Sequence, residues 1–158
     1  MTFDLRDMTK WDKRFFAVCD LVASWSEDQS RKVGAVIVGS GQEIRSTGYN
    51  GFPRGVKAED PARHSKEGGE KYHWFEHAER NAIYNAARHG TGLQGCTLYA
   101  NLFPCADCVR AIIQSGITHL KTYEMPPSDQ TYARSFIVSM EMLREAGIAV
   151  STYRRPAA

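Results

Sequence analysis

The sequence predicts an α/β domain with three layers, α/β/α, in which helices cover both faces of a five-stranded mixed sheet. Two observations lead to that fold class. Helical and strand-like segments alternate along the 158 residues in the order α-β-β-α-β-α-β-α-β. The first two strand-like segments are joined through a turn at Gly39, Ser40 and Gly41, which indicates an antiparallel hairpin. A hairpin followed by strands that alternate with helices gives both antiparallel and parallel pairs.

The first half of the chain contains a helix, the hairpin and a long insertion. Apolar side chains recur with a helical period over residues 11–25. Residues 33–38, VGAVIV, are typical of a strand buried on both faces, and residues 43–49 supply the second strand. We interpret residues 51–75, which mix charges with glycines and prolines, as an irregular insertion. Loops this long in a compact domain are often functional, the alternative being a surface excursion without a role.

The second half of the chain alternates between helix and strand, and each of its helices ends near a glycine. The expected helices are 76–88, 105–115 and 129–146, and the expected strands are 97–102, 117–123 and 148–153. Met125, Pro126 and Pro127 interrupt the chain before the last helix. We therefore expect residues 1–158 to form a single domain, of a size that buries a core without disulfides.

The composition excludes several classes of protein. Hydrophobic residues make up 42% of the chain and charged residues 24%, as in globular domains. No apolar run reaches the roughly 18 residues that cross a bilayer. Because 20 Lys and Arg nearly balance 18 Asp and Glu, the net charge of +2 gives no electrostatic reason to expect a nucleic-acid or membrane partner. Residues 1–13 do not resemble a signal peptide, which favours a cytoplasmic protein.

Two of the four cysteines stand three positions apart. Cys19 and Cys96 are isolated, whereas Cys105 and Cys108 lie in the sequence Pro-Cys-Ala-Asp-Cys at Pro104. In a reducing cytosol, clustered cysteines bind metal more often than they form disulfides. A helix that begins near Pro104 brings both sulfurs to one face of its first turn, where free backbone N–H groups favour the thiolate form.

A second short motif, His77-Ala78-Glu79, stands at the start of another expected helix. Thiolate sulfur and imidazole nitrogen are ligands that Zn²⁺ prefers, so we expect His77, Cys105 and Cys108 to bind zinc. Three protein ligands leave the fourth position open for water, as in catalytic zinc sites. Glu79 is close enough to move a proton between that water and a substrate nitrogen. This chemistry suits the hydrolytic deamination of an amidine-like ring carbon.

Other interpretations of these residues remain open at this point. The C-x-x-C pair could be redox-active, although such pairs belong to a thioredoxin-like context. A structural zinc site would need a fourth ligand, for which Cys96, His64 and His73 are candidates. His77 by itself would be read as an ordinary core histidine. The combination of H-x-E with P-C-x-x-C favours a zinc deaminase over all three.

The chain resembles the cytidine deaminase-like superfamily and, within it, the deoxycytidylate (dCMP) deaminase family. The likeness extends over about residues 11–122. It rests on four stretches: VGAVIV, STGYNGFPRG at 46–55, HAERNAI at 77–83 and LFPCADCVRAIIQSGI at 102–117. The third and fourth contain motifs found across the superfamily, whereas G-Y-N-G-x-P-x-G with the insertion after it is more specific to dCMP deaminases.

The resemblance implies a single zinc-dependent deaminase domain that converts dCMP to dUMP and ammonia. It assigns the zinc to His77, Cys105 and Cys108 and the proton transfers to Glu79. The alternatives are the deamination of another small nucleobase, nucleoside or modified nucleotide, and a tRNA or other nucleic-acid deaminase. The second alternative lacks the basic face or tail that it would need.

The resemblance also implies substrate contacts and partners. Asn50 matches an asparagine that contacts the sugar, and Ala78 and the backbone near Pro104 match the region that contacts the pyrimidine edge. Tyr132 is a candidate for the aromatic residue near the base, the alternative being a tyrosine on a helix surface. Family members are homo-oligomers, from dimers to hexamers, and several respond to dCTP and dTTP as allosteric effectors.

Overall fold

A six-stranded sheet forms the centre of the molecule. The computed structural model describes residues 2–3, 7–125 and 129–156, so Pro126 and Pro127, where we expected a break, lie outside it. The strands are β1 (Thr2–Phe3), β2 (Gly34–Val38), β3 (Ile44–Tyr49), β4 (Thr97–Ala100), β5 (His119–Tyr123) and β6 (Ala149–Tyr153). Their order is β1-β6-β5-β4-β2-β3. The five predicted strands are all present, and the two-residue β1 extends the sheet at one edge.

The sheet is mixed, as predicted. The β2–β3 hairpin and the β2–β4 pair are antiparallel, whereas β4, β5 and β6 run parallel to one another. Parallel neighbours need a helical crossover between them, and α4 and α5 supply the two crossovers. The carboxyl ends of the parallel strands therefore face the same edge of the sheet, where α/β folds usually bind ligands.

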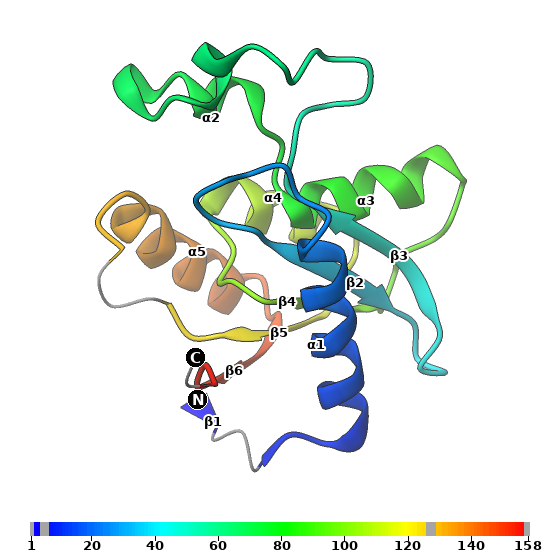
Figure 1. Cartoon of the computed structure of the whole chain (residues 1–158). Coiled ribbons are helices and arrows are strands. Elements are labelled where there is room, and N and C mark those ends of the chain that lie inside the picture. The colour runs from blue at the N-terminus through cyan, green and yellow to red at the C-terminus, as the bar shows by residue number, and fades with distance from the viewer. Residues whose placement is uncertain (1, 4–6, 126–128, 157–158) are drawn as a thin grey trace.

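Helices cover both faces of the sheet (Figure 1), which confirms the three-layer fold class. The helices are α1 (Lys10–Ala23), α2 (Lys71–Trp74), α3 (Ala78–Arg88), α4 (Ala106–Gln114) and α5 (Ala133–Glu145). Helix α1 lies on one face, and α3, α4 and α5 lie side by side on the other. Helix α5 begins at Ala133 rather than at the expected 129, because the Asp129 carboxylate accepts the Tyr132 N–H in a preceding turn.

Strand β2 is the centre of the core, because all five of its residues are buried. Ala35 and Ile37 belong to the apolar cluster beneath α3, α4 and α5. Val36 and Val38 belong to a second cluster beneath α1, together with aromatic residues such as Phe16. Successive side chains of a strand point to opposite faces, so the continuous apolar run was a sound indication of a strand covered on both sides.

The close packing of α3 on the edge strand β3 depends on a glycine. A Cβ at Gly48 would lie 2.3 Å from the backbone nitrogen of Ala82 and 2.4 Å from the carbonyl oxygen of Ala78. Only glycine fits this approach. The hydroxyl of Ser46 donates to the Ala82 carbonyl at 2.6 Å and holds the same turn of α3. The start of α3 is thereby fixed against the sheet.

Residues 51–75 form an excursion that is closed at its base. Gly51 and Glu76 form a two-hydrogen-bond bridge, with N···O distances of 3.1 and 2.8 Å. Between them lie α2 and two 3₁₀ turns, Pro61–His64 and Glu67–Gly69, so the segment is less irregular than expected. Phe52 packs on Phe75 with ring centroids 4.5 Å apart and gives the segment a small aromatic centre. Figure 1 shows the segment standing above the sheet and helices.

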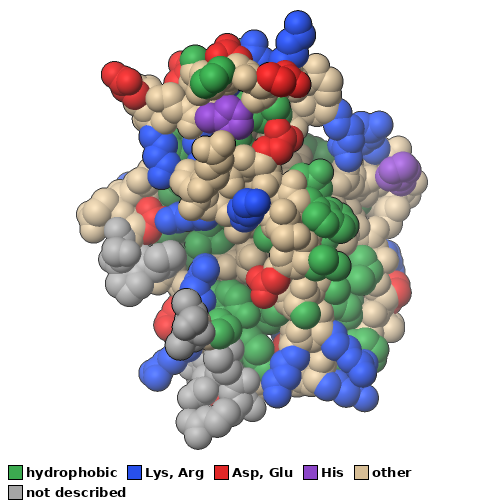
Figure 2. Space-filling model, viewed as in Figure 1, with side chains coloured by type: hydrophobic (Ala, Val, Ile, Leu, Met, Phe, Trp, Pro, Cys, Tyr) green, Lys and Arg blue, Asp and Glu red, His purple; other side chains and the backbone are tan. Residues whose placement is uncertain are grey.

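The visible face of the molecule mixes charges of both signs. Figure 2 shows Lys and Arg side chains interspersed with Asp and Glu side chains on that face, without one continuous basic surface. This distribution agrees with the net charge of +2. Among the described residues, no helix has the length and apolar character required to cross a membrane.

Candidate metal centre and substrate pocket

The starts of α3 and α4 bring the two sequence motifs together. His77 is the N-cap residue of α3, and its backbone N–H donates to the Glu76 carboxylate at 2.9 Å. Cys105 is the N-cap residue of α4, and Cys108 is buried in its first turn. Helices α3 and α4 pack against each other, so the three side chains, though up to 31 positions apart, converge at the carboxyl-end edge of the sheet.

The geometry of the three side chains fits zinc. The Nδ1 atom of His77 lies 3.3 Å from the sulfur of Cys105 and 3.5 Å from the sulfur of Cys108. Ligand bonds of about 2.0–2.3 Å at a tetrahedral ion require similar separations, roughly 3.5–3.8 Å. Within residues 2–3, 7–125 and 129–156, this is the only such group of three or more His, Cys, Asp or Glu side chains. The candidates for a fourth ligand, Cys96, His64 and His73, do not belong to it.

The surroundings of the two thiols shift their pKa values in opposite directions. The hydrogen bond from Cys108, assisted by the one with His77, lowers the pKa of the Cys105 thiol to about 4, although burial opposes the shift. The same hydrogen bond and deep burial raise the pKa of Cys108. Cysteine thiolate and imidazole nitrogen are donors that zinc prefers, and a lowered thiol pKa favours the thiolate form. The donor set therefore fits the metal both chemically and geometrically.

Glu79 is the buried acid of the site. Its side chain lies in the first turn of α3, is 3% exposed and reaches within 3.5 Å of the Cys108 sulfur. Burial raises the pKa of Glu79 above its ordinary value. A carboxyl group with a raised pKa holds a proton more readily than an ordinary carboxylate, which favours its use in general acid–base catalysis.

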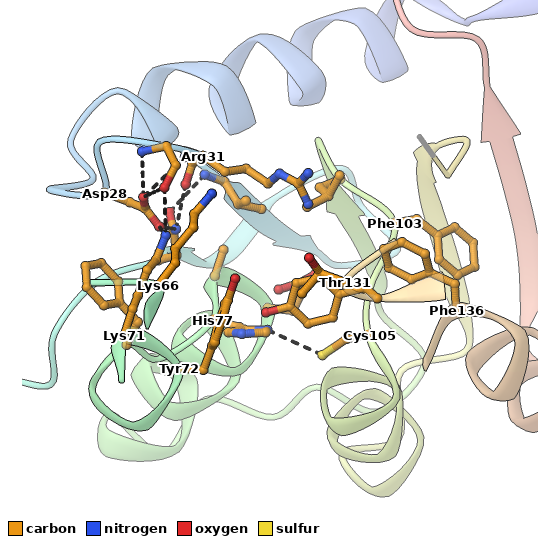
Figure 3. Close-up of a pocket in the computed structure, with 18 residues that line it drawn as sticks. Asp28, Arg31, Lys66, Lys71, Tyr72, His77, Phe103, Cys105, Thr131 and Phe136 are labelled. Carbon is orange, nitrogen blue, oxygen red and sulfur yellow. Dashed lines mark hydrogen bonds and ion pairs between the residues drawn. The ribbon is translucent and has the colours of Figure 1, made fainter. Parts of the chain in front are cut away.

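A pocket of about 150 Å³ opens beside these groups, and Figure 3 shows its lining. His77, Glu79 and Cys105 line its inner part. Three of the four predicted substrate contacts, Asn50, Ala78 and Tyr132, also line it. Pro104, the fourth, is buried and is not among the lining residues, although its neighbours Phe103 and Cys105 are. The pocket thus brings most of the predicted site into one space.

The cytidine and deoxycytidylate deaminase zinc-binding region is the family whose model matches this chain, over residues 9–124. The chain belongs to this family. A relative from Aliivibrio fischeri, an uncharacterized deaminase encoded in the luxG 3′ region, is 40% identical over 147 residues, which are 91% of this chain and 94% of the relative. The family is defined by its zinc region, and the His77–Cys105–Cys108 group supplies the matching zinc site here.

Two further relatives are named for the deamination of dCMP in particular. Human deoxycytidylate deaminase is 42% identical over 114 residues, which are 70% of this chain, and the chain covers 63% of the length of the human enzyme. The dCMP deaminase of cyanophage S-TIM5, solved in complex with dCMP and dUMP, superposes with a TM-score of 0.69 over 92% of this chain and 98% of its own. At 23% identity, that likeness shows a shared fold.

Asn50 of this deaminase organises the loop that precedes β2. Its side-chain oxygen accepts the Val33 N–H at 2.9 Å, and its amide donates to the Arg31 carbonyl and to the Asp28 carboxylate. Both amide hydrogens are therefore engaged within the protein, while one lone pair of the oxygen is still available. A direct contact between Asn50 and the sugar stays a prediction.

Aromatic rings surround the metal group. The Tyr132 ring lies edge-on to His77 at a centroid distance of 6.1 Å, and it also contacts Phe136 at 5.9 Å. Tyr72, from the excursion, meets Tyr132 edge-on at 6.1 Å. Tyr132 is therefore part of the pocket wall rather than a tyrosine on an open helix surface. Its contact with a base stays a prediction.

Sequence reasoning did not predict the ion pairs made by the charged residues that line the pocket. Lys71 forms a buried ion pair with Asp28 at 2.5 Å, and its ammonium also donates to the Ser30 hydroxyl. Arg31 pairs with the buried Asp129 at 2.5 Å. These partners are 43 and 98 positions apart, and neither pair belongs to a motif. The sequence shows the density of charge within residues 51–75 and the basic Arg31 after the first helix, but not which charges pair.

Proposed function

We propose that this chain deaminates deoxycytidylate, converting dCMP and water to dUMP and ammonia in pyrimidine nucleotide metabolism. One observation carries the proposal: the buried Glu79 lies beside the His77–Cys105–Cys108 group and lines a pocket that aromatic and charged side chains also line. The curated human relative is named for this activity. The domain would be residues 1–158, with residues 51–75 as its insertion.

The chain's own residues would perform the proton transfers. Zinc, held by His77, Cys105 and Cys108, would supply a water of lowered pKa when bound. The Glu79 carboxylate accepts a proton as water adds to carbon 4 of the cytosine ring, and it delivers that proton to ring nitrogen 3. It then takes the proton of the new hydroxyl group on carbon 4 and passes it to the exocyclic amine, the bond from carbon 4 to that nitrogen breaks as the carbonyl forms, and ammonia leaves. The raised pKa of Glu79 suits both directions of transfer.

The substrate contacts follow from the lining of the pocket. Ala78, fully buried at the start of α3, would present its backbone to the pyrimidine edge, and the backbone near Pro104 would assist. Tyr132 would pack on the base. Asn50 would contact the sugar through its remaining oxygen lone pair and would hold the loop around it. Burial of these groups excludes water from the reacting carbon.

We also propose a homo-oligomer, from a dimer to a hexamer, with dCTP and dTTP as possible effectors. Exposed aromatic residues support an assembly, because Trp25 and Tyr49 meet edge-on at 5.9 Å while 56% and 38% exposed. A cytoplasmic location is consistent with four free cysteines, since a thiol-based zinc site requires reduced sulfur.

The decisive experiment compares the wild-type protein with Glu79→Gln on a substrate panel. The change in ultraviolet absorbance of each base on deamination is followed with dCMP, dCTP, deoxycytidine, cytosine and guanine. We expect dCMP to be the best substrate and kcat to fall about 10³- to 10⁴-fold in Glu79→Gln. Zinc content measured by elemental analysis should be equal in both proteins, because Glu79 is not in the ligand group.

Two outcomes would contradict the proposal. Turnover that survives Glu79→Gln would remove Glu79 from the proton transfers. Turnover of guanine or free cytosine in preference to dCMP would assign the chain to another small substrate. A labelled tRNA tested at low salt provides the nucleic-acid comparison, and a salt-dependent shift there would support that alternative instead.

A further inference from the structure

A chain of charged side chains connects the start of α3 with the start of α4. One carboxylate oxygen of Glu76 accepts the His77 N–H at 2.9 Å and the Arg80 Nε–H at 2.6 Å. A terminal nitrogen of Arg80 lies 3.5 Å from the carboxylate of Asp107, which stands in the first turn of α4 between the two zinc-binding cysteines. The chain therefore links the residue before one metal ligand with the residue between the other two.

The zinc group depends on the separation of these two helix starts. Cys105 and Cys108 share one turn of α4, so the distance between their sulfurs is set within that helix. His77 comes from α3, and its Nδ1 atom lies 3.3 and 3.5 Å from the two sulfurs. Packing holds each helix on the sheet, but metal–ligand distances are defined to about 0.2 Å. A small sliding of α3 past α4 would therefore take the imidazole out of reach of an ion that the sulfurs hold.

Arg80 is suited to fixing this separation by its surroundings and by its shape. Its side chain is 20% exposed and that of Glu76 is 23% exposed, so solvent screens their pair less than it screens an open surface pair. A guanidinium presents its N–H groups as a planar fork, which lets two of its nitrogens bind two carboxylates at once. In the described part of the chain, Arg80–Asp107 is the one ion pair that joins α3 with α4.

We propose that Arg80 is a positioning residue of the zinc site, which holds the start of α3 at the separation from α4 that keeps His77 within reach of the metal. The inference needs the zinc group but does not depend on the identity of the substrate. Arg80 does not line the pocket, so it acts through Glu76 and Asp107 rather than on the substrate. Loss of Arg80 should therefore weaken the hold on zinc and leave substrate binding largely unchanged.

The rate of zinc release from the metal-loaded protein tests this role. The wild type, Arg80→Ala, Arg80→Lys and Asp107→Asn are each mixed with an excess of a colour-forming zinc chelator, after elemental analysis and circular dichroism have confirmed that each is loaded and folded. We expect release to accelerate about tenfold in Arg80→Ala, which loses both carboxylate contacts, and about threefold in Asp107→Asn, which loses only the half-exposed one. Arg80→Lys should give an intermediate rate, because an ammonium keeps the charge without the fork. If Arg80→Ala does not fold, the exposed Asp107→Asn still decides, and an unchanged rate there would overturn the proposal.

Arg110→Ala is the matched control. Arg110 pairs with the same carboxylate of Asp107, but it belongs to α4 itself and is 59% exposed. Its removal changes the net charge by the same amount as Arg80→Ala and leaves the link between the helices in place. Release should stay within about twofold of the wild-type rate. Equal acceleration in Arg80→Ala and Arg110→Ala would overturn the proposal, because local positive charge, and not the link, would then retain the metal.

Two further readouts separate positioning from a general loss of stability. If Arg80 acts through Asp107, the double variant Arg80→Ala with Asp107→Asn should release zinc no faster than Arg80→Ala alone, whereas effects that multiply fully would contradict the link. Co²⁺ bound in place of zinc reports the arrangement of its ligands through its visible absorption. The bands of Arg80→Ala should weaken and shift relative to the wild type, and unchanged bands would show that the ligands keep their positions without Arg80.

Turnover provides the last comparison. With dCMP, kcat of Arg80→Ala should fall about tenfold while KM stays within about twofold, because Arg80 does not line the pocket. A rise in KM with kcat unchanged would place Arg80 in substrate binding and overturn the proposal. If the wild type does not turn over dCMP, the proposed function fails, and the rates of zinc release still decide the role of Arg80.

Discussion

The two walls of the pocket are held in place by different forces. The wall that carries the metal group consists of helix starts packed on a buried sheet, and its close contacts with the sheet are apolar or backbone contacts, such as that of Gly48 with α3. The wall formed by the excursion stands outside the core and is attached by the Lys71–Asp28 pair and by ring contacts such as Phe52–Phe75. The metal group is therefore held in place by the core, whereas the part of the pocket lining that the excursion supplies depends on a polar attachment.

The two kinds of contact also differ in how their loss changes the free energy of unfolding. Apolar contacts between close-packed elements cannot be removed singly without loss of stability over the whole domain. An ion pair with little exposure contributes little net free energy, but removal of one partner leaves a buried charge and costs several kcal/mol. Substitutions in the packed contacts of the wall that carries the metal group should therefore destabilise the whole domain. Substitutions at the attachment of the excursion should unfold that segment alone.

The largest effect is expected for Cys105→Ala, which removes a metal ligand. Zinc content by elemental analysis should fall to background, and dCMP turnover should be lost with it. Cys96→Ala is the control, because Cys96 is a buried cysteine outside the ligand group. It should retain zinc and activity despite some loss of packing. Full zinc occupancy in Cys105→Ala would remove Cys105 from the ligand set.

The second largest effect is expected for Gly48→Ala. The new methyl group would overlap backbone atoms of Ala78 and Ala82, so α3 must move away from β3. Overpacking of this kind costs about 1–3 kcal/mol of stability. Because Glu79 and His77 move with α3, kcat should also fall about 100-fold. Thermal unfolding and initial rates measure the two effects.

Gly92→Ala is the matched control for that substitution. A Cβ at Gly92 meets nothing within 4 Å. Both the unfolding midpoint and kcat should therefore remain close to those of the wild type. A stable and fully active Gly48→Ala protein would show that α3 can move away from β3 without harm, so the metal group would not depend on their close packing.

A smaller effect is expected for Lys71→Ala, which leaves the Asp28 carboxylate buried without its cation. The attachment of the excursion should weaken by about 3 kcal/mol. We expect KM for dCMP to rise about tenfold and protease cleavage within residues 51–75 to accelerate, while zinc content stays unchanged. Asp28→Asn combined with Lys71→Met should recover part of the protease resistance. Loss of zinc in Lys71→Ala would contradict a local failure.

The smallest effect is a pH dependence of the same attachment. Burial alone would raise the pKa of Asp28, but the hydrogen bonds from Lys71 and from the backbone of Ser30 and Arg31 outweigh it, so the pKa lies below the ordinary 3.8. A depressed folded-state pKa gives stability that is fully present above the unfolded value and is lost as the pH falls through the folded value. The protection factors of the α2 amides, which correct for the pH dependence of intrinsic exchange, should therefore be constant from about pH 8 to 5 and should fall below about pH 4.

The sequence was most informative where chemistry or periodicity is local. His77, Glu79, Cys105 and Cys108 were identifiable because their types and spacings within two short motifs are set by zinc chemistry. The doubly buried strand β2 was identifiable because every residue from Gly34 to Val38 suits a buried position. These features need no knowledge of which segments meet in space.

The sequence was least informative where function depends on partners far apart in the chain. No pattern links Asp28 with Lys71 across 43 positions. The same holds for Asp12, whose buried carboxylate accepts hydrogen bonds from Tyr99 at 2.8 Å and from Lys121 at 2.7 Å. Such pairs are set by tertiary contacts, which the order of residues alone does not reveal. They include the ion pairs of the pocket lining that sequence analysis did not predict.

Because Gly51 and Glu76 are bridged, the segment between them could be replaced by another. Because the two ends of the excursion are hydrogen-bonded to each other, these hydrogen bonds fix the distance between the ends, whatever residues lie in between. A segment of different length or charge could be grafted between these two positions without a change in the spacing of β3 and α3. Substrate preference can in this way be redesigned, or can diverge among related proteins, while the zinc site stays as it is.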